Sequence, residues 1–435
     1  MSIDSLARAL AVRAAMPALV RPQRVATRIF GGRIYNVRPV TTDVVTYETL
    51  IALAAPAEAI RVLFAFGQTV SGDAVTPRAT VTAASVASIA QIPAGETVLV
   101  PVPDCVPSGG TIPQFAPAGA AGRRVFYRSA WVSLPSVPRG DGHGGALYAV
   151  RTSLSLADGS GNVVLLGNGT DRFDNWDAHP SGRLFRMRSK IGVSATNWAG
   201  MTDANSIAAT GSPVVGLEYL ARGKVVSVMG FGDSIAEGRG TYLNEGFGLP
   251  ACVAASRNPG GIAFEWSNLG WSGHAMAQTT EQVQAAIAFG LRPSLAVVPL
   301  GSPNNASGGA ITPAQVGAMR LQAAEATAAL ERAGVPVLPF TWAPTDPRVR
   351  AYGASDALRR AYGADAAAMA RGGGMVCDFA EALSGPPDAQ GQSVPPANLM
   401  PDGIHPGDAG NAILANLLRA ALDRMADCRP GYRAA

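Results

Sequence analysis

The most constraining feature of the chain is an apolar run that ends in a serine. Residues 224–238 read KVVSVMGFGDSIAEG, a β-branched stretch followed by small residues and a glycine-flanked turn. A run of this kind predicts a buried strand of a parallel sheet, and ligand sites in such sheets lie just beyond the carboxyl ends of the strands. The sequence therefore places Ser234 where the chemistry of a parallel-sheet protein usually takes place.

Two common glycine-rich motifs do not fit this segment. A dinucleotide-binding Gly-x-Gly-x-x-Gly motif starting at Gly230 would need a glycine where Ile235 stands, and no Gly-Lys-Ser/Thr follows. The Gly-x-Ser-x-Gly elbow of the α/β-hydrolases would need a glycine where Ala236 stands. We therefore exclude both a phosphate-binding loop and that elbow.

The overall composition predicts an ordered chain of two domains. The chain has 435 residues, of which 48% are hydrophobic and 15% charged, and this length is comfortable for two domains. The net charge of +4 is small, and no basic run is interleaved with aromatic residues. The densest basic patch, residues 183–190, is interpreted as a solvated strand or loop face. Nucleic acid is therefore not an expected partner.

No segment of the chain predicts a membrane span or a secretory signal. No apolar run approaches the roughly 18 residues of a membrane helix, and residues 1–30 contain no apolar core followed by a cleavage site. We expect a protein without a membrane span, either cytoplasmic or exported by a non-classical route.

The cysteines do not predict a metal or redox site. Cys105, Cys252, Cys377 and Cys428 lie far apart, without a Cys-x-x-Cys pair. We expect structural thiols, with a Cys377–Cys428 disulfide as the alternative. No cluster of His, Asp and Glu suggests a metal, and no cofactor is expected.

The first half of the chain predicts an N-terminal arm and an all-β domain. Residues 1–39 are expected to form the arm, because the first of them have helical composition and then meet Pro17 and Pro22. Residues 40–222 contain short β-type runs separated by Gly, Pro and Asp, which predicts a β-sandwich of jelly-roll type. The expected strands are Thr46–Ala54, Ile60–Phe66, Ala79–Ile89, Thr97–Val102, Arg124–Ser133, Ala146–Leu156 and Val163–Leu166.

Residues 223–435 predict an α/β domain, because strand and helix patterns alternate. The clearest helix is Thr312–Ala333, with Thr312 as N-cap, Gln315 completing a capping box and Gly334 as the stop. Another helix is expected to start after Pro406 and to run to about Met425. Strands with crossing helices predict a three-layer, flavodoxin-like parallel sheet. The expected strands are Val225–Gly230, Ile262–Asn268, Leu295–Leu300, Val335–Phe340 and Met375–Asp378.

Four short segments of this α/β region resemble the SGNH (GDSL-like) hydrolase family. The first is Gly232-Asp233-Ser234, and residues 268–273 (NLGWSG), 301–305 (GSPNN) and 402–405 (DGIH) follow in the family's order. The resemblance covers roughly residues 223–435 and does not extend to the first half of the chain. It implies the flavodoxin-like fold and a serine esterase that works without a cofactor.

A serine hydroxyl is a poor nucleophile unless a base takes its proton and a third group orients that base. His405 is the candidate base, and it follows Asp402 by three positions. In a tight turn, this spacing lets the carboxylate reach Nδ1–H while Nε2 faces outward. The alternative is an acid that only caps a helix. Asp233 is expected to brace the serine turn, and His274 to line an acyl pocket or lie at the surface.

The resemblance also implies an oxyanion hole, the set of donors that stabilises negative charge on the carbonyl oxygen. By position, the donors are the backbone N–H groups of Ser234 and Gly273 and the side chain of Asn304. Gly270 and Asn305 are the alternatives. Asn305 stands where the family usually has an aspartate, which puts a supporting hydrogen bond in doubt.

The predicted function is a serine esterase that hydrolyses carboxylic esters of small molecules or carbohydrates through an acyl-enzyme. The layout of a β-sandwich followed by a catalytic domain is similar to some carbohydrate O-acetyl esterases, so acetylated sugar is the first substrate expected. A short-chain acyl esterase, lipase or thioesterase is the alternative. From another class, the alternative is a glycan-binding surface or phage-tail-type protein with an accessory hydrolase domain. The sequence does not indicate an oligomeric state.

Overall fold

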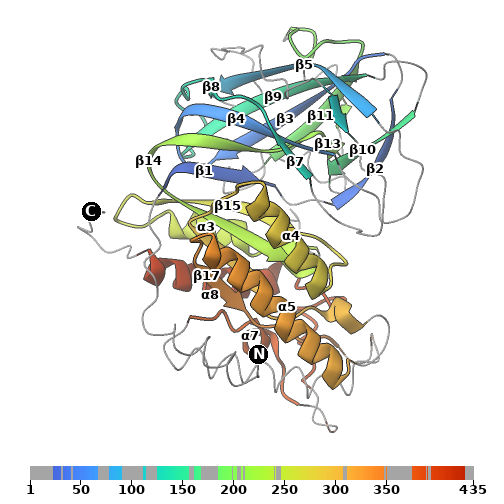
Figure 1. The fold of residues 1–435 in the computed structure, drawn as a ribbon. Helices are drawn as coiled ribbons and strands as arrows, with labels where there is room; N and C mark the ends of the chain where they lie inside the picture. The colour runs from blue at the N-terminus through green and yellow to red at the C-terminus, as the bar shows by residue number, and fades with distance from the viewer. Residues whose placement is uncertain are drawn as a thin grey trace. The chain divides into compact units, whose positions relative to one another are not determined.

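The computed structural model contains two compact units (Figure 1). The first, here called the β unit, comprises Gln23–Ser227 and Ala263–Asn268, and the second, the α/β unit, includes Val228–Ile262 and Leu269–Ala435. The structure describes residues 23–30, 33–40, 43–66, 78–90, 111–113, 125–155, 161–167, 185–197, 199–202, 207–208, 211–239, 241, 246–306, 311–346, 349, 375–387, 389 and 393–426.

One sheet of the β unit has six antiparallel strands in the order β12-β11-β3-β9-β5-β6. The carboxylate of Glu48 on β3 is buried here, and its Oε2 accepts a hydrogen bond of 2.7 Å from Arg151 Nε, while its Oε1 accepts one of 2.8 Å from Arg188 Nε. Two cations thus compensate the buried charge, which would otherwise be costly. The bounds are β3 Val45–Leu53, β5 Arg78–Ile89, β6 Thr111–Pro113, β9 Ala146–Ser155, β11 Phe185–Ile191 and β12 Ile207–Ala208.

The other strands of the β unit pair around β4 and β14. A hydrogen bond of 2.7 Å between Thr49 Oγ1 on β3 and Ser212 Oγ on β13 joins them to the first sheet. The bounds are β1 Gln23–Ile29, β2 Arg33–Val40, β4 Ala57–Phe66, β7 Val125–Arg128, β8 Val132–Ser133, β10 Gly161–Gly167, β13 Gly211–Ser212 and β14 Val214–Gly232.

Two features of the β unit differ from the sequence expectations. Strands β1 and β2 occupy positions that were expected to belong to an N-terminal arm, and β1 pairs antiparallel with β14. Residues 183–190 are not simply a solvated face, because on β11 Met187 is buried and Arg188 binds Glu48. The expected strand Thr97–Val102 and the first twenty residues lie outside the described part of the chain.

Strand β14 runs through the expected domain boundary between residues 222 and 223. The segment Arg222-Gly223-Lys224 has the composition of a linker, yet its backbone stays in the strand, with Gly223 at φ +117°. Residues Val214–Ala221 pair antiparallel with β4, while Val228–Gly230 pair parallel with β16. The division between the two units falls between Ser227 and Val228.

The α/β unit contains a parallel sheet. The end of β14 pairs parallel with β16 (Leu295–Pro299), which pairs parallel with β17 (Val337–Phe340). Strand β15 (Ala263–Gly270), most of which belongs to the β unit, pairs with β14. All five residues of β16 are buried, as its unbroken apolar run predicts. Around Cys377, where a fifth strand was expected, the described residues form a single parallel bridge to Phe340.

Helices pack in pairs in this unit: α4 lies against α5, and α3 lies against α8 (Figure 1). Helix α5 has the predicted bounds and signals, because Thr312 caps it, Gln315 completes the capping box and Gly334 follows it at φ +75°. The helices are α2 Ser234–Glu237, α3 Gly248–Ala255, α4 Met276–Ala288, the 3₁₀ helix η4 Pro303–Ala306, α5 Pro313–Arg332, α7 Phe379–Leu383 and α8 Asp408–Met425.

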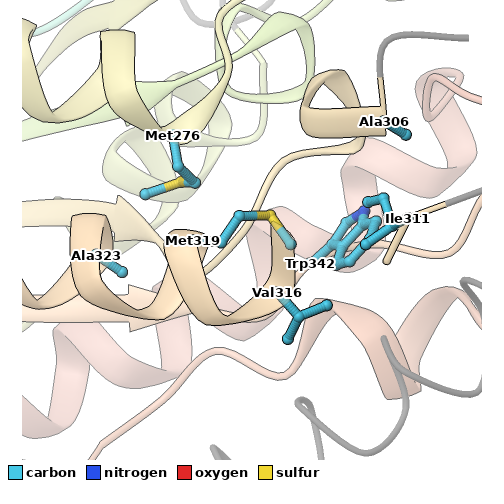
Figure 2. Close-up of a cluster of buried hydrophobic side chains, with 7 residues drawn as sticks. All are labelled: Met276, Ala306, Ile311, Val316, Met319, Ala323 and Trp342. Atoms are coloured by element: carbon cyan, nitrogen blue, oxygen red, sulfur yellow. The ribbon is translucent and has the colours of Figure 1, made fainter. Parts of the chain in front are cut away.

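A cluster of buried side chains packs α4, α5 and η4 together (Figure 2). Met276 and Met319 are fully buried in it, and Leu300 packs against it. Met276 begins α4 and Ala306 ends η4. The cluster therefore anchors the loop between β15 and α4 and the segment between β16 and the end of η4. Its members are Met276, Ala306, Ile311, Val316, Met319, Ala323 and Trp342.

The structure also bears on the expectations about membrane helices and cysteines. Among the described residues, no helix is long and apolar enough to cross a membrane. Cys377 is a free, buried thiol, and burial raises its pKa to about 12. Cys428, its partner in the alternative of a Cys377–Cys428 disulfide, lies outside the described residues.

Candidate active site

Ser234 lies at the point where β14 ends and α2 begins. Gly232, the last residue of β14, has φ +142°, and a Cβ there would approach Ala236 Cβ to 2.9 Å. Asp233 caps the short helix, since its Oδ1 accepts a hydrogen bond of 2.9 Å from the backbone N–H of Ile235. The glycine and the cap together produce the sharp turn that presents the serine.

His405 and Asp402 form a hydrogen-bonded series with this serine. Ser234 Oγ lies 2.9 Å from His405 Nε2, and His405 Nδ1 lies 2.6 Å from Asp402 Oδ2. Ser234 and His405 are both buried, being 4% and 8% exposed. The geometry suits a neutral imidazole that carries its proton on Nδ1 and accepts the serine proton at Nε2.

The carboxylate of Asp402 closes the turn that carries His405. Its Oδ1 accepts hydrogen bonds from the backbone N–H groups of Ile404, at 2.9 Å, and His405, at 2.7 Å. Burial acts to raise the pKa of Asp402, but the hydrogen bonds from His405 and Ile404 outweigh it, so the pKa lies below its ordinary value of 3.8. Asp402 therefore stays ionised beside His405, although its side chain is 56% exposed.

The two candidate glycines of the oxyanion hole have different surroundings. Gly270 ends β15, and a Cβ there would come within 2.2 Å of the backbone nitrogen of Glu237, so its missing side chain is required for packing against α2. Gly273 has φ +90° and open space at the Cβ position. The loop between them is held to α2 by a hydrogen bond of 2.7 Å from the Ser272 N–H to Glu237 Oε2.

The two candidate asparagines bind different segments. Asn304 Nδ2 donates a hydrogen bond of 3.0 Å to the carbonyl oxygen of His274. A carbonyl only accepts, so the amide nitrogen faces it and a second amide N–H is directed elsewhere. Asn305 Oδ1 accepts a hydrogen bond of 3.0 Å from the Met276 N–H, at the start of α4. Asn305 thus provides the acceptor that the absent aspartate put in doubt.

His274, Trp271 and Trp342 are buried. The imidazole of His274 stacks on Trp271, with ring centroids 5.4 Å apart and planes inclined by 5°. His274 is 2% exposed, so the alternative of a surface histidine is wrong. Trp342 belongs to the hydrophobic cluster of Figure 2.

Ser302 is the residue of this site that sequence reasoning missed. Its Oγ lies 2.6 Å from Asp233 Oδ2 and 2.9 Å from the carbonyl oxygen of His274, and it accepts a hydrogen bond of 3.2 Å from the Asn304 N–H. Burial raises the pKa of Asp233 above its ordinary value of 3.8, against the lowering effect of its bonds to Ser302 and Ile235. A serine between a glycine and a proline carries no local signal for such a position.

Within the described residues, no group of three or more His, Cys, Asp or Glu side chains is arranged to hold a metal ion. The side chains of the site place a serine hydroxyl beside an imidazole, a carboxylate on the far side of that imidazole, and an amide donor nearby.

Comparison with known proteins gives a match to the second half of the chain. Residues 231–413 match the GDSL-like Lipase/Acylhydrolase family. Comparison with curated proteins found no significant match.

Several solved structures are similar to part of the chain at low identity. A GDSL-like lipase from Bacteroides thetaiotaomicron has 15% identity, with 45% of this chain and 87% of that chain covered and a TM-score of 0.34. TesA has 22% identity, with 46% of this chain and 99% of that chain covered and a TM-score of 0.34. A mutant of Axe2, an acetylxylan esterase from Geobacillus stearothermophilus, has 17% identity, with 45% of this chain and 93% of that chain covered and a TM-score of 0.31.

Proposed function

We propose that the α/β unit, in which residues 231–413 match the GDSL-like Lipase/Acylhydrolase family, is a serine esterase that hydrolyses carboxylic esters through an acyl-enzyme. The observation that carries this proposal is the series from Ser234 Oγ through His405 to Asp402, with contacts of 2.9 and 2.6 Å. The reaction needs only these side chains, an ester and water.

In the first step, Ser234 Oγ attacks the ester carbonyl carbon while its proton passes to His405 Nε2. The imidazolium that forms is stabilised by the ionised Asp402, whose lowered pKa keeps it charged. The tetrahedral intermediate then expels the alcohol, which takes the proton from Nε2. The products of this half-reaction are the acylated serine and the free alcohol.

The oxyanion of the intermediate needs donors that are already in position. We assign this role to the backbone N–H groups of Ser234 and Gly273 and to the second amide N–H of Asn304. The first amide N–H of Asn304 binds the His274 carbonyl, which fixes the plane of the amide. Asn305 Oδ1 accepts a hydrogen bond from the Met276 N–H, which holds this side chain at the start of α4, so we assign the role to Asn304 and keep Asn305 as the alternative.

In the second half-reaction, water loses a proton to His405 Nε2 and attacks the acyl carbon. The intermediate collapses, the carboxylic acid leaves and Ser234 Oγ recovers its proton. His405 therefore acts as a base and then as an acid in each half-reaction.

For the substrate, we propose an O-acetyl group on carbohydrate as the first class, with short-chain acyl esters and thioesters as the alternative. The arrangement of a β unit followed by a catalytic unit supports placing carbohydrate O-acetyl esters before short-chain acyl esters and thioesters. In the same proposal, the β unit is an accessory β-sandwich, and the α/β unit has the flavodoxin-like three-layer arrangement.

The test is a panel of nitrophenyl esters, acyl thioesters and acetylated glycans with wild type and Ser234→Ala. The variant should lose on the order of 10⁶ in kcat, because the nucleophile is removed, and a fluorophosphonate probe should label Ser234 in the wild type. The matched control is Ser384→Ala, which deletes a hydroxyl that donates to the Ala380 carbonyl. Labelling at another serine, or a Ser234→Ala enzyme with near-wild-type kcat, would refute the proposal.

A further inference from the structure

Ser302 lies between β16 and η4 and is completely buried. Its hydroxyl contacts three groups from three separate parts of the chain: Asp233 Oδ2 at 2.6 Å, the His274 carbonyl at 2.9 Å and the Asn304 N–H at 3.2 Å. Each of these groups is next to, or part of, the proposed machinery. Asp233 precedes the nucleophile, His274 follows the oxyanion glycine, and Asn304 is the side-chain donor.

The hydrogen-bonding capacity of the Ser302 hydroxyl suits its contacts with these three groups. A serine hydroxyl donates one hydrogen bond and accepts two. When Asp233 is ionised, Ser302 donates to it and accepts from the Asn304 N–H. When Asp233 is protonated, which its buried position favours, the carboxyl donates to Ser302 and the hydroxyl proton turns to the His274 carbonyl. In both states the hydroxyl links the serine turn to the segment that carries Asn304.

The same carbonyl oxygen ties Ser302 to Asn304. The His274 carbonyl lies within hydrogen-bonding distance of both Ser302 Oγ and Asn304 Nδ2. When Asp233 is protonated, Ser302 donates to this carbonyl and so holds the group that sets the direction of the Asn304 amide and the backbone just after Gly273. Met276 and Ala306, which come shortly after His274 and Asn304 in the chain, both belong to the apolar cluster of Figure 2.

On this geometry, and resting on the proposed esterase function, we propose that Ser302 is a positioning residue for the oxyanion hole. It touches neither substrate nor the reacting atoms. It holds the amide of Asn304 and the loop after Gly273 at a set distance from the Ser234 turn. Because the donors stabilise the transition state, an error in their position lowers kcat more than it weakens substrate binding.

The expected effect of Ser302→Ala is a loss of about 10- to 100-fold in kcat with little change in KM, since a misplacement near 1 Å can cost on the order of 10²-fold. Ser302→Thr retains a hydroxyl and should recover much of this loss. Ser384→Ala removes a partly buried hydroxyl hydrogen bond outside the site and should leave kcat unchanged. Melting temperatures of all three variants separate positioning from stability, because a merely structural residue would lower the melting temperature without changing the kcat of the folded enzyme.

Two results would overturn the proposal. One is a Ser302→Ala enzyme with wild-type kcat at temperatures where it is folded. The other is a crystal structure of Ser302→Ala in which the Asn304 amide and the His274 carbonyl have not moved. This structure also separates the two proposals. If the wild type hydrolyses no ester and Ser234 is not labelled, the esterase proposal fails, and the position of Asn304 in the variant alone decides the role of Ser302.

Discussion

His405 Nε2 lies 2.9 Å from Ser234 Oγ, although the two residues are 171 positions apart in the chain. The serine is fixed by the end of β14, and the histidine by a turn just before α8. The pair therefore exists only when the α/β unit is folded, and each partner can be tested separately.

His405→Ala should lower kcat nearly as much as removal of the nucleophile, on the order of 10⁶, because Ser234 then has no base. Asp402→Asn should cost less, about 10⁴, because the base is kept but its tautomer and orientation are disturbed. Steady-state kinetics of both variants on one activated ester measures the difference. A larger loss for Asp402→Asn than for His405→Ala would contradict this assignment of roles.

Asn304→Ala should lower kcat by roughly 10²–10³ with little change in KM, because its second amide N–H acts on the oxyanion. Asn305→Ala is the matched variant, and its main effect should be on stability, since its side chain binds the Met276 N–H at the start of α4. Kinetics and thermal unfolding of both proteins check this. The reverse pattern would shift the assignment of the oxyanion donor by one residue.

The two aspartates of the site should affect stability with opposite dependence on pH. The pKa of Asp402 is lowered in the folded state, so its contribution to stability is present above the unfolded value and is lost as pH falls through the folded value. The pKa of Asp233 is raised, so its contribution is present at low pH and is lost as pH rises through the folded value.

Unfolding free energies of Asp402→Asn and Asp233→Asn relative to wild type, measured against pH, test these signs. Relative to wild type, Asp402→Asn should become more destabilised as pH rises through the acidic range, and Asp233→Asn should become less destabilised. The asparagine at 233 can still accept from Ile235 and donate to Ser302, so this variant is expected to fold. If the destabilisation changed with pH in the same direction for both variants, the direction of the pKa shift assigned to one of the two carboxyl groups would be wrong.

Gly232→Ala should destabilise the protein by about 1–3 kcal/mol, because φ is +142° and the new Cβ would meet Ala236 at 2.9 Å. Gly317→Ala is the control. Gly317 is exposed within α5, with nothing near its Cβ position, so alanine there should stabilise by about 0.5–1 kcal/mol. Chemical denaturation measures both, and equal effects would contradict the strained turn.

The sequence predicted those elements whose signals are local. Helix α5 could be predicted in both bounds, because Thr312, Gln315 and Gly334 lie within or beside it. The full extent of β14 could not, because Arg222 and Lys224 have linker composition and the strand is defined by its pairing with β4.

The same contrast holds for the site. Ser234, Asp402 and His405 were expected together because each lies in a short segment that resembles the family's own. Ser302 has no such signal. Its importance depends on three contacts that form only when distant segments of the chain meet.

The unequal space around Gly270 and Gly273 has a consequence for protein engineering. A side chain at position 270 would collide with the backbone of Glu237, whereas one at position 273 would enter open space and meet only the strain of φ +90°. Among the non-glycine residues, asparagine and aspartate adopt positive φ most readily. In a saturation library, position 270 should therefore yield only glycine among folded clones, while position 273 should also yield asparagine and aspartate. Such clones would alter the loop beside the serine without loss of the fold, and position 273 is thus the natural place to begin directed evolution of this site.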